Sequence, residues 1–322
     1  MAHSVTRRKF IAASAATGLG LGLAADGNAG EAKFKTTLKK GAILAKPTED
    51  ALKKAKDGGF EGVESTDWGV APEEAAKCRE AAEKIGIRIH SVMRGWAEFN
   101  AKDPAKLADS VASAEKALRA AQGYGADAIL LVPCRIGGGG MAMPEAWDFK
   151  IELDEKNGHL KSVAAGDNEK YKAYIEAHDW ATDSTREAVK KLIPIAEQTK
   201  VVIALENVWN NLWVRPALHK WLVSSFASPW VKAYFDIANN IKYVPVGPEE
   251  WIRTLGPLLA KCHAKDFKLN PDGHGGSWPS LRQGSVKWPE VRKALDEIGY
   301  NGWLTIEGAG SAKDLDLIFK GE

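Results

Sequence analysis

The sequence contains little cysteine. Its 322 residues include only Cys78, Cys134 and Cys262, and no two of them form a C-x-x-C pair. An odd number of cysteines without a paired motif does not support a disulfide framework or a structural zinc site. We therefore interpret all three as small buried side chains.

The sequence also lacks an excess of charge of either sign. The formal net charge is +2, from 44 Lys and Arg against 42 Asp and Glu. This near balance argues against a broad nucleic-acid-binding or membrane-binding surface. Beyond the first residues, no apolar run is long enough to span a membrane. We therefore expect no nucleic-acid partner and no stable membrane insertion of the mature protein.

Two phosphate-binding motifs are missing. No G-x-G-x-x-G follows the first predicted strand, which disfavours an open dinucleotide-binding sheet. The four glycines at 137–140 precede no Gly-Lys-Ser/Thr, so they do not form a phosphate-binding loop. Internal repeats are missing too, which argues against a repeat architecture.

The first 31 residues differ from the rest of the chain. The basic segment 6–10 (TRRKF) precedes a mildly apolar run at 11–25 that is rich in Ala and Gly. This pattern predicts a twin-arginine signal peptide, and a disordered basic leader is the alternative. The twin-arginine route carries folded proteins and suits an enzyme that acquires a metal before export. We therefore expect a periplasmic or extracellular protein.

Short apolar runs alternate with amphipathic segments through the remainder of the chain. The predicted strands are 37–44, 62–65, 88–92, 128–133, 201–207, 231–237, 259–266 and 302–307. The predicted helices are 49–56, 73–84, 104–121, 168–198, 216–224, 248–254, 289–298 and 312–319. Eight strands that alternate with helices indicate a parallel sheet. Their count and the chain length predict a single-domain (β/α)8 TIM barrel over residues 34–322.

Two of the connections that follow strands are unusually long. One is an insertion loop at about 135–170, and the other runs from about 268 to 285. A barrel of this kind carries its active site on the face where the strands end, so both loops are expected beside it. Long loops often serve as lids or binding loops. A mobile surface excursion is the alternative for the first loop.

Four potential metal ligands lie at the carboxyl ends of the last four predicted strands. They are Glu206, Asp236, His263 and Glu307. Taken singly, Asp236 could cap a helix and Glu307 could pair with an arginine. Together they converge on one barrel mouth, where buried carboxylates need a partner. Oxygen-rich ligation with one His and no thiolate suits Mn, Mg, Co, Fe or Zn, so we predict one divalent metal.

The segments around these residues resemble those of the xylose isomerase-like TIM barrel family, which includes sugar phosphate isomerases and epimerases. The resemblance is carried by ALEN at 204–207, FDIAN at 235–239, HAKD at 263–266, GSVKWPEV at 284–291 and TIEG at 305–308. It covers most of the chain after the leader. It implies that Glu206, Asp236, His263 and Glu307 bind the metal.

The resemblance also implies an activity. In ketose 3-epimerase relatives, the glutamates that match Glu206 and Glu307 face opposite sides of a substrate carbon, where one removes a proton and the other returns one. The metal bridges a carbonyl and a hydroxyl and stabilises the enediolate. We therefore expect a divalent-metal-dependent sugar isomerase or epimerase with Glu206 and Glu307 as catalytic residues. Family members often dimerise, so a homodimer is a further expectation.

One position departs from the epimerase pattern. Those relatives place a His three positions beyond the Asp, where this sequence has Asn239. An amide can donate to a substrate oxygen, but it cannot transfer a proton at neutral pH. The arginine that follows the strand-seven His in those relatives has no match either. Lys265 or Lys268 is expected to supply that positive charge.

Further substrate contacts are expected from two earlier strands and from tryptophans. Glu64 ends the second predicted strand and His90 lies on the third, and each is either a substrate contact or a satisfied structural polar group. A flat aromatic face can pack on the C–H face of a sugar ring, although ordinary core packing is the alternative. The tryptophans on segments that follow strands are Trp68, Trp96, Trp209 and Trp278.

Three other functions fit parts of the sequence. A metal-dependent lyase or dehydratase acting beside a ketone, on an inosose or a 3-keto-glycoside, would use the same metal and base. A DNA-repair endonuclease of the same superfamily needs more His and acidic ligands than a chain with seven His offers. A non-catalytic carbohydrate-binding protein is the third alternative. Sugar binding alone does not require the four predicted metal ligands, so their presence argues against it.

Overall fold

The computed structural model describes residues 34–322, and the export signal expected at 1–31 lies outside the described residues. Eight parallel strands close into a barrel in the order β1-β12-β9-β8-β7-β4-β3-β2. The single-domain (β/α)8 TIM barrel is therefore confirmed. The barrel strands are β1 Lys39–Leu44, β2 Gly62–Ser65, β3 Arg88–Trp96, β4 Ala128–Val132, β7 Val202–Glu206, β8 Val231–Asp236, β9 Leu259–Ala264 and β12 Trp303–Ile306.

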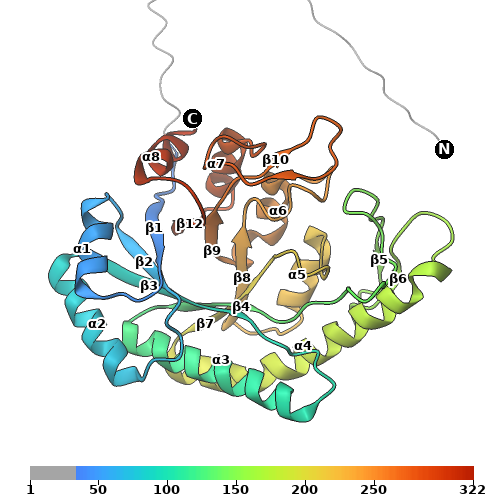
Figure 1. Cartoon of the computed structure of the whole chain (residues 1–322), viewed down its shortest axis with the longest axis horizontal. Helices are drawn as coiled ribbons and strands as arrows, with labels where there is room; N and C mark the ends of the chain where they lie inside the picture. The colour runs from blue at the N-terminus through green and yellow to red at the C-terminus, as the bar shows by residue number, and fades with distance from the viewer. Residues whose placement is uncertain (1–33) are drawn as a thin grey trace, which may run out of the picture. The chain divides into compact units, whose positions relative to one another are not determined.

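Helices surround the strands (Figure 1). They are α1 Glu49–Asp57, α2 Pro72–Ile85, α3 Pro104–Tyr124, α4 Lys172–Thr199, α5 Pro216–Ser224, α6 Pro248–Leu255, α7 Trp288–Glu297 and α8 Ala312–Lys320, with short 3-10 turns at Glu169–Tyr171 and Gly256–Leu258. The bounds lie close to those expected from the sequence. Within residues 34–322, no helix is both long and apolar enough to cross a membrane.

Local capping explains where several helices begin. The Thr48 hydroxyl accepts a hydrogen bond of 3.3 Å from the backbone N–H of Ala51, and Asp103 Oδ1 accepts one of 2.9 Å from that of Ala105. Such side chains satisfy backbone N–H groups that lack partners in the first turn. Pro72 occupies the first turn of α2, where its missing N–H is tolerated.

Alternate residues of the strands fill the inside of the barrel. Side chains from β4, β7 and β8 form a compact interior cluster, separate from the larger core between strands and helices; it comprises Ala128, Leu130, Val132, Ala204 and Tyr234. Successive residues of a strand point to opposite faces. Glu206 therefore shares the inward face of Ala204, and Asp236 shares that of Tyr234.

Each long connection carries a small hairpin. β5 Glu152–Leu153 pairs with β6 Leu160–Ser162 in the insertion loop, and β10 Lys268–Leu269 pairs with β11 Gly276–Ser277 in the loop after β9. Both hairpins lie toward the right of the barrel in Figure 1. The ring of Trp147 stacks on that of His274 with centroids 3.9 Å apart, so the two connections contact each other.

Candidate metal centre

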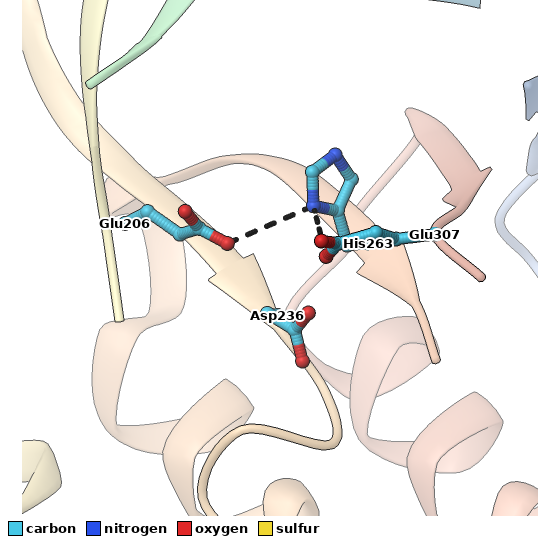
Figure 2. A group of neighbouring side chains, drawn as sticks. All are labelled: Glu206, Asp236, His263 and Glu307. Atoms are coloured by element: carbon cyan, nitrogen blue, oxygen red, sulfur yellow. Dashed lines mark ion pairs between the residues drawn. The ribbon is translucent and has the colours of Figure 1, made fainter. Parts of the chain in front are cut away.

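The four predicted ligands meet at the carboxyl end of the barrel. Glu206 ends β7, Asp236 ends β8, His263 is the next-to-last residue of β9, and Glu307 directly follows β12. One potential ligand atom from each residue lies within 4.8 Å of those from the other three. Figure 2 shows the carboxyl groups and one ring nitrogen of His263 gathered around a common space. We call these four residues the tetrad.

His263 lies between the two glutamates. Its Nδ1 is 3.2 Å from Oε2 of Glu307 and 3.7 Å from Oε1 of Glu206. His263 and Asp236 are fully buried and Glu206 is nearly so, whereas the Glu307 side chain is 31% exposed. The tetrad is therefore reached from solvent on the Glu307 side.

Burial and mutual charge shift the pKa values of the tetrad. Burial and the negative charge of Glu307 raise the pKa of Asp236 well above its usual value, and burial also raises the pKa of Glu206. Burial opposes protonation of His263, but the surrounding carboxylates, led by Glu64, raise its pKa well above the usual value. Three acidic groups thus share a small buried volume, an arrangement that a bound divalent cation would stabilise.

The residues present fit a divalent cation. Asp236 Oδ2, His263 Nδ1 and Glu307 Oε2 are buried and make no well-aligned hydrogen bond within the described part of the chain, although the last two lie 3.2 Å apart. Such atoms are rare in native proteins, and each costs about 1–3 kcal/mol. Ligand atoms at about 2.0–2.2 Å from an ion lie at most about 4.4 Å apart. The tetrad atoms need only small movements to close to that spacing.

Two asparagines hold Asp236 in place. The side chain of Asn207 accepts from the backbone N–H of Asp236 at 2.7 Å and donates to its carbonyl at 2.8 Å. Asp236 Oδ1 accepts from the backbone N–H groups of Ala238 and Asn239, both at 2.8 Å, which leaves Oδ2 toward the tetrad. The amide of Asn239 donates to the carbonyl of Asn207 at 3.0 Å. The amide of Asn239, for which the sequence predicts a substrate contact, thus bonds the backbone beside Asp236.

Glu64 and His90 lie inside the barrel. Both are fully buried. Glu64 contacts the far side of the His263 ring, and His90 Nε2 lies 3.1 Å from the hydroxyl of Thr305 while its ring stacks on Trp303. The protein thus supplies partners for Glu64 and for Nε2 of His90, whereas His90 Nδ1 has no hydrogen-bond partner within the described residues.

Lys265 and an aromatic cluster border the tetrad. The Nζ atom of Lys265 lies 3.3 Å from Glu307 Oε1 and 3.9 Å from Asp236 Oδ2, and it also lies 4.5 Å over the ring of Trp278. Trp278 is 45% exposed and packs against Trp209 and Phe267. Lys265 thus supplies positive charge at the tetrad, whereas Lys268 is exposed on β10.

Each tryptophan singled out in the sequence carries a cation on its ring. Trp209 has the Nζ of Lys242 at 3.8 Å from its centroid, and its edge packs on Phe267. Arg94 lies over Trp68 and Arg135 over Trp96, at 4.5 and 4.2 Å. The ring of Trp209 is therefore engaged by the protein, and the exposed surface of Trp278 is the one that adjoins the tetrad.

Two residues of this region escaped the sequence analysis. Asn207 directly follows the ligand Glu206, so its position in the ALEN segment was the available signal. In the sequence, Tyr234 resembles an ordinary aromatic residue of a strand. Only its position two residues before Asp236 indicates that its side chain faces the barrel interior.

Comparison with known proteins assigns the fold to a family. Residues 52–318 match the family described as xylose isomerase-like TIM barrel. The chain belongs to this family. An uncharacterized protein of Methanocaldococcus jannaschii is 28% identical over 129 residues, which cover 39% of this chain and 43% of that protein. The chain therefore spans less than half the length of this curated relative.

Solved structures share the family fold at low identity. A xylose isomerase domain protein from Planctomyces limnophilus has a TM-score of 0.60 at 20% identity, covering 88% of this chain and 94% of that one. A D-tagatose 3-epimerase-like protein has a TM-score of 0.64 at 18% identity, covering 87% and 94%. A 3-keto-D-glucoside 4-epimerase from E. coli has a TM-score of 0.60 at 13% identity, covering 88% and 97%. At these identities the likeness concerns the fold.

Proposed function

We propose that this protein is a divalent-metal-dependent isomerase or epimerase that moves protons on a sugar-like substrate. The observation that carries this proposal is the convergence of Glu206, Asp236, His263 and Glu307 within 4.8 Å at the carboxyl end of the barrel. Family membership supports it, as do the printed names of two structural neighbours, a D-tagatose 3-epimerase-like protein and a 3-keto-D-glucoside 4-epimerase.

Strand order gives the two glutamates opposite positions. The tetrad comes from the contiguous strands β12-β9-β8-β7, so Glu307 and Glu206 are its two outermost members. A substrate held between them presents one face of a carbon atom to each carboxylate. One glutamate then removes a proton from that carbon, and the other returns one to the opposite face.

The tetrad and Lys265 would provide metal binding and substrate polarisation in the proposed reaction. A bound divalent cation would polarise a substrate carbonyl and so acidify the neighbouring C–H bond. Asp236 and His263, held by the barrel interior, would keep that cation between the glutamates. The ammonium group of Lys265, 3.3 Å from Glu307, is placed to donate a hydrogen bond to a substrate oxygen. Trp278 would exclude water from this side.

A lyase or dehydratase acting beside a ketone is the second candidate. The observation that favours it is the ammonium of Lys265 next to Glu307, because an acid beside the base can protonate a departing hydroxyl or alkoxide. Its substrate would be an inosose or a 3-keto-glycoside. The products distinguish the two reactions, since elimination yields an enone or a released aglycone.

The test is incubation of metal-loaded protein with ketoses, inososes and 3-keto-glycosides in D2O, followed by NMR. We expect solvent deuterium beside the carbonyl together with an epimer or isomer. Glu206→Gln and Glu307→Gln are expected to lower the rate about 10²–10⁴-fold, and Glu49→Gln, an exposed surface glutamate, is the control. A wild-type protein that binds metal and sugar yet exchanges no substrate hydrogen is a carbohydrate-binding protein, and the proposal is then wrong.

A further inference from the structure

The His263 ring has two different neighbours. Its Nδ1 faces the carboxylates of Glu206 and Glu307, whereas its Nε2 lies 2.8 Å from Oε1 of Glu64. Glu64 belongs to β2, so its side chain reaches His263 on β9 through the barrel interior. Both side chains are fully buried. The contact is therefore a fixed feature of the interior.

The second oxygen of Glu64 is also engaged. The Tyr234 hydroxyl donates to Glu64 Oε2 at 2.8 Å, and the Tyr234 ring lies 4.6 Å from the His263 ring. Tyr234 is fully buried in the interior cluster with Ala204 and the β4 side chains. This packing leaves the phenol little freedom, so it fixes the plane of the Glu64 carboxylate.

This arrangement determines which nitrogen of His263 is free. A carboxylate accepts hydrogen bonds and does not donate them, so Nε2 of His263 carries the proton that faces Glu64. In the neutral ring, Nδ1 then holds a lone pair directed at the other three tetrad members. A partner of this kind orients a histidine ligand and makes it more basic.

We propose that Glu64 is a positioning residue that holds His263 with Nδ1 ready to bind a metal, and that Tyr234 in turn holds Glu64. This inference rests on the proposed metal site. Glu64, which the sequence suggested as a substrate contact, would instead set the affinity and geometry of the metal centre without touching substrate.

The test is a metal titration that does not depend on turnover. Metal-free wild-type, Glu64→Gln and Tyr234→Phe proteins are titrated with Zn²⁺ or Mn²⁺ against a competing fluorescent chelator. Glu64→Gln keeps the side-chain volume but removes the charge, and we expect it to weaken metal binding about 10–100-fold. Tyr234→Phe leaves Glu64 in place and should weaken binding less. Asp266→Asn is the control, because Asp266 is equally buried and held by Phe267, Val286 and Trp288.

A second measurement separates positioning from a general loss of stability. In Zn²⁺-loaded protein labelled with ¹⁵N-histidine, we expect a slowly exchanging, strongly hydrogen-bonded Nε2 proton on His263 that exchanges faster in Glu64→Gln, where the acceptor is neutral, and is unchanged in Asp266→Asn. Wild-type metal binding that Glu64→Gln leaves unchanged overturns the positioning role alone. Failure of the wild-type protein to bind any divalent metal overturns the proposed function instead.

Discussion

Among single residues, Lys265 places an ammonium group 3.3 Å from Glu307 and 3.9 Å from Asp236. Burial opposes its protonation, but Asp236 and Glu307 raise its pKa above the usual value, so the side chain is cationic at neutral pH. This charge lies beside the proposed metal site. Lys265 therefore both neutralises the carboxylates of the metal-free protein and repels an incoming metal ion.

Lys265→Met should bind divalent metal more tightly than the wild type. Removing a charge that lies 3.3 and 3.9 Å from two ligand oxygens relieves repulsion, and we expect about a tenfold gain in affinity. Turnover should fall in the same variant because the substrate loses a hydrogen-bond donor. Chelator competition measures the affinity. Lys268→Met removes an exposed charge from β10 and should change neither the metal affinity nor the turnover. Weaker metal binding by Lys265→Met would contradict this prediction and would show that Lys265 stabilises the bound metal.

Among the elements, the two hairpin-bearing connections act as a pair. Trp147 of the insertion loop stacks on His274 between β10 and β11, and Trp278 directly follows β11. At its other end, the insertion loop is tied to α4, where His159 Nε2 lies 3.0 Å from Asp183. The stack therefore couples the insertion loop to the segment that places Trp278 beside the tetrad.

Breaking the Trp147–His274 stack should loosen both connections. We expect Trp147→Ala and His274→Ala to be non-additive, with a coupling free energy of about 0.5–1.5 kcal/mol, because either change removes the whole aromatic pair. Native-state hydrogen exchange of residues 268–277 reports the loosening. His159→Ala is the matched control, since it releases the α4 end while leaving the stack in place. Equal exchange at 268–277 in Trp147→Ala and wild type would show that the loops are independent.

At the scale of the whole molecule, buried histidines and the tetrad make stability depend on pH in opposite directions. Burial lowers the pKa of His219 to about 4, so this side chain stays neutral in the folded state. The pKa of His263 is raised instead, so the metal-free fold retains a proton on this side chain that the unfolded chain releases above about pH 6.5. The contribution of these two histidines to the stability of the metal-free protein is therefore expected to decline on both sides of about pH 6.5.

Below about pH 6.5, His219 should account for a measurable part of the loss in the free energy of unfolding. As the pH falls from about 6.5 to 4, the unfolded chain gains a proton at His219 that the folded protein does not, which removes up to about 3 kcal/mol of stability. His219→Gln can still donate to the Leu205 carbonyl, which His219 Nε2 approaches at 3.2 Å. Urea unfolding of this variant should show a flatter dependence on pH between 6.5 and 4. An unchanged slope would assign the acid sensitivity to other groups.

On the alkaline side, a divalent metal should replace the retained protons. The stabilising contribution of protonated His263 is complete below about pH 6.5 and is lost as the pH rises through its higher folded pKa. Metal binding competes with these protons, so its stabilisation should be larger at pH 8 than at pH 6. At a hundredfold excess over Kd we expect about 2.7 kcal/mol, or about 5–10 °C in Tm. Calorimetry with and without EDTA measures this, and equal Tm values at pH 8 would argue against the metal site.

The fold and the candidate ligands could be predicted from the sequence more accurately than the partners of other polar residues. The predicted strands at 201–207 and 231–237 correspond to β7 and β8, and Glu206 and Asp236 stand at their ends as expected. Glu64 and His90 were placed on the correct strands, but the sequence left open whether substrate or protein satisfies them. Asn239 was compared with a proton-transferring histidine, whereas its amide bonds a neighbouring strand end.

The sequence by itself determined the barrel and the tetrad because both depend on short-range patterns. The alternation of side chains along a strand determines which of them face the barrel interior, and capping residues indicate where helices begin. Ligands at the ends of four consecutive strands all lie at the carboxyl end of the barrel. Only the tertiary structure decided which partner each buried polar group has. Closure and stagger of the strands bring Glu64 of β2 against His263 of β9, and chain folding brings Trp147 against His274. These contacts join residues far apart in the chain, so no local pattern encodes them.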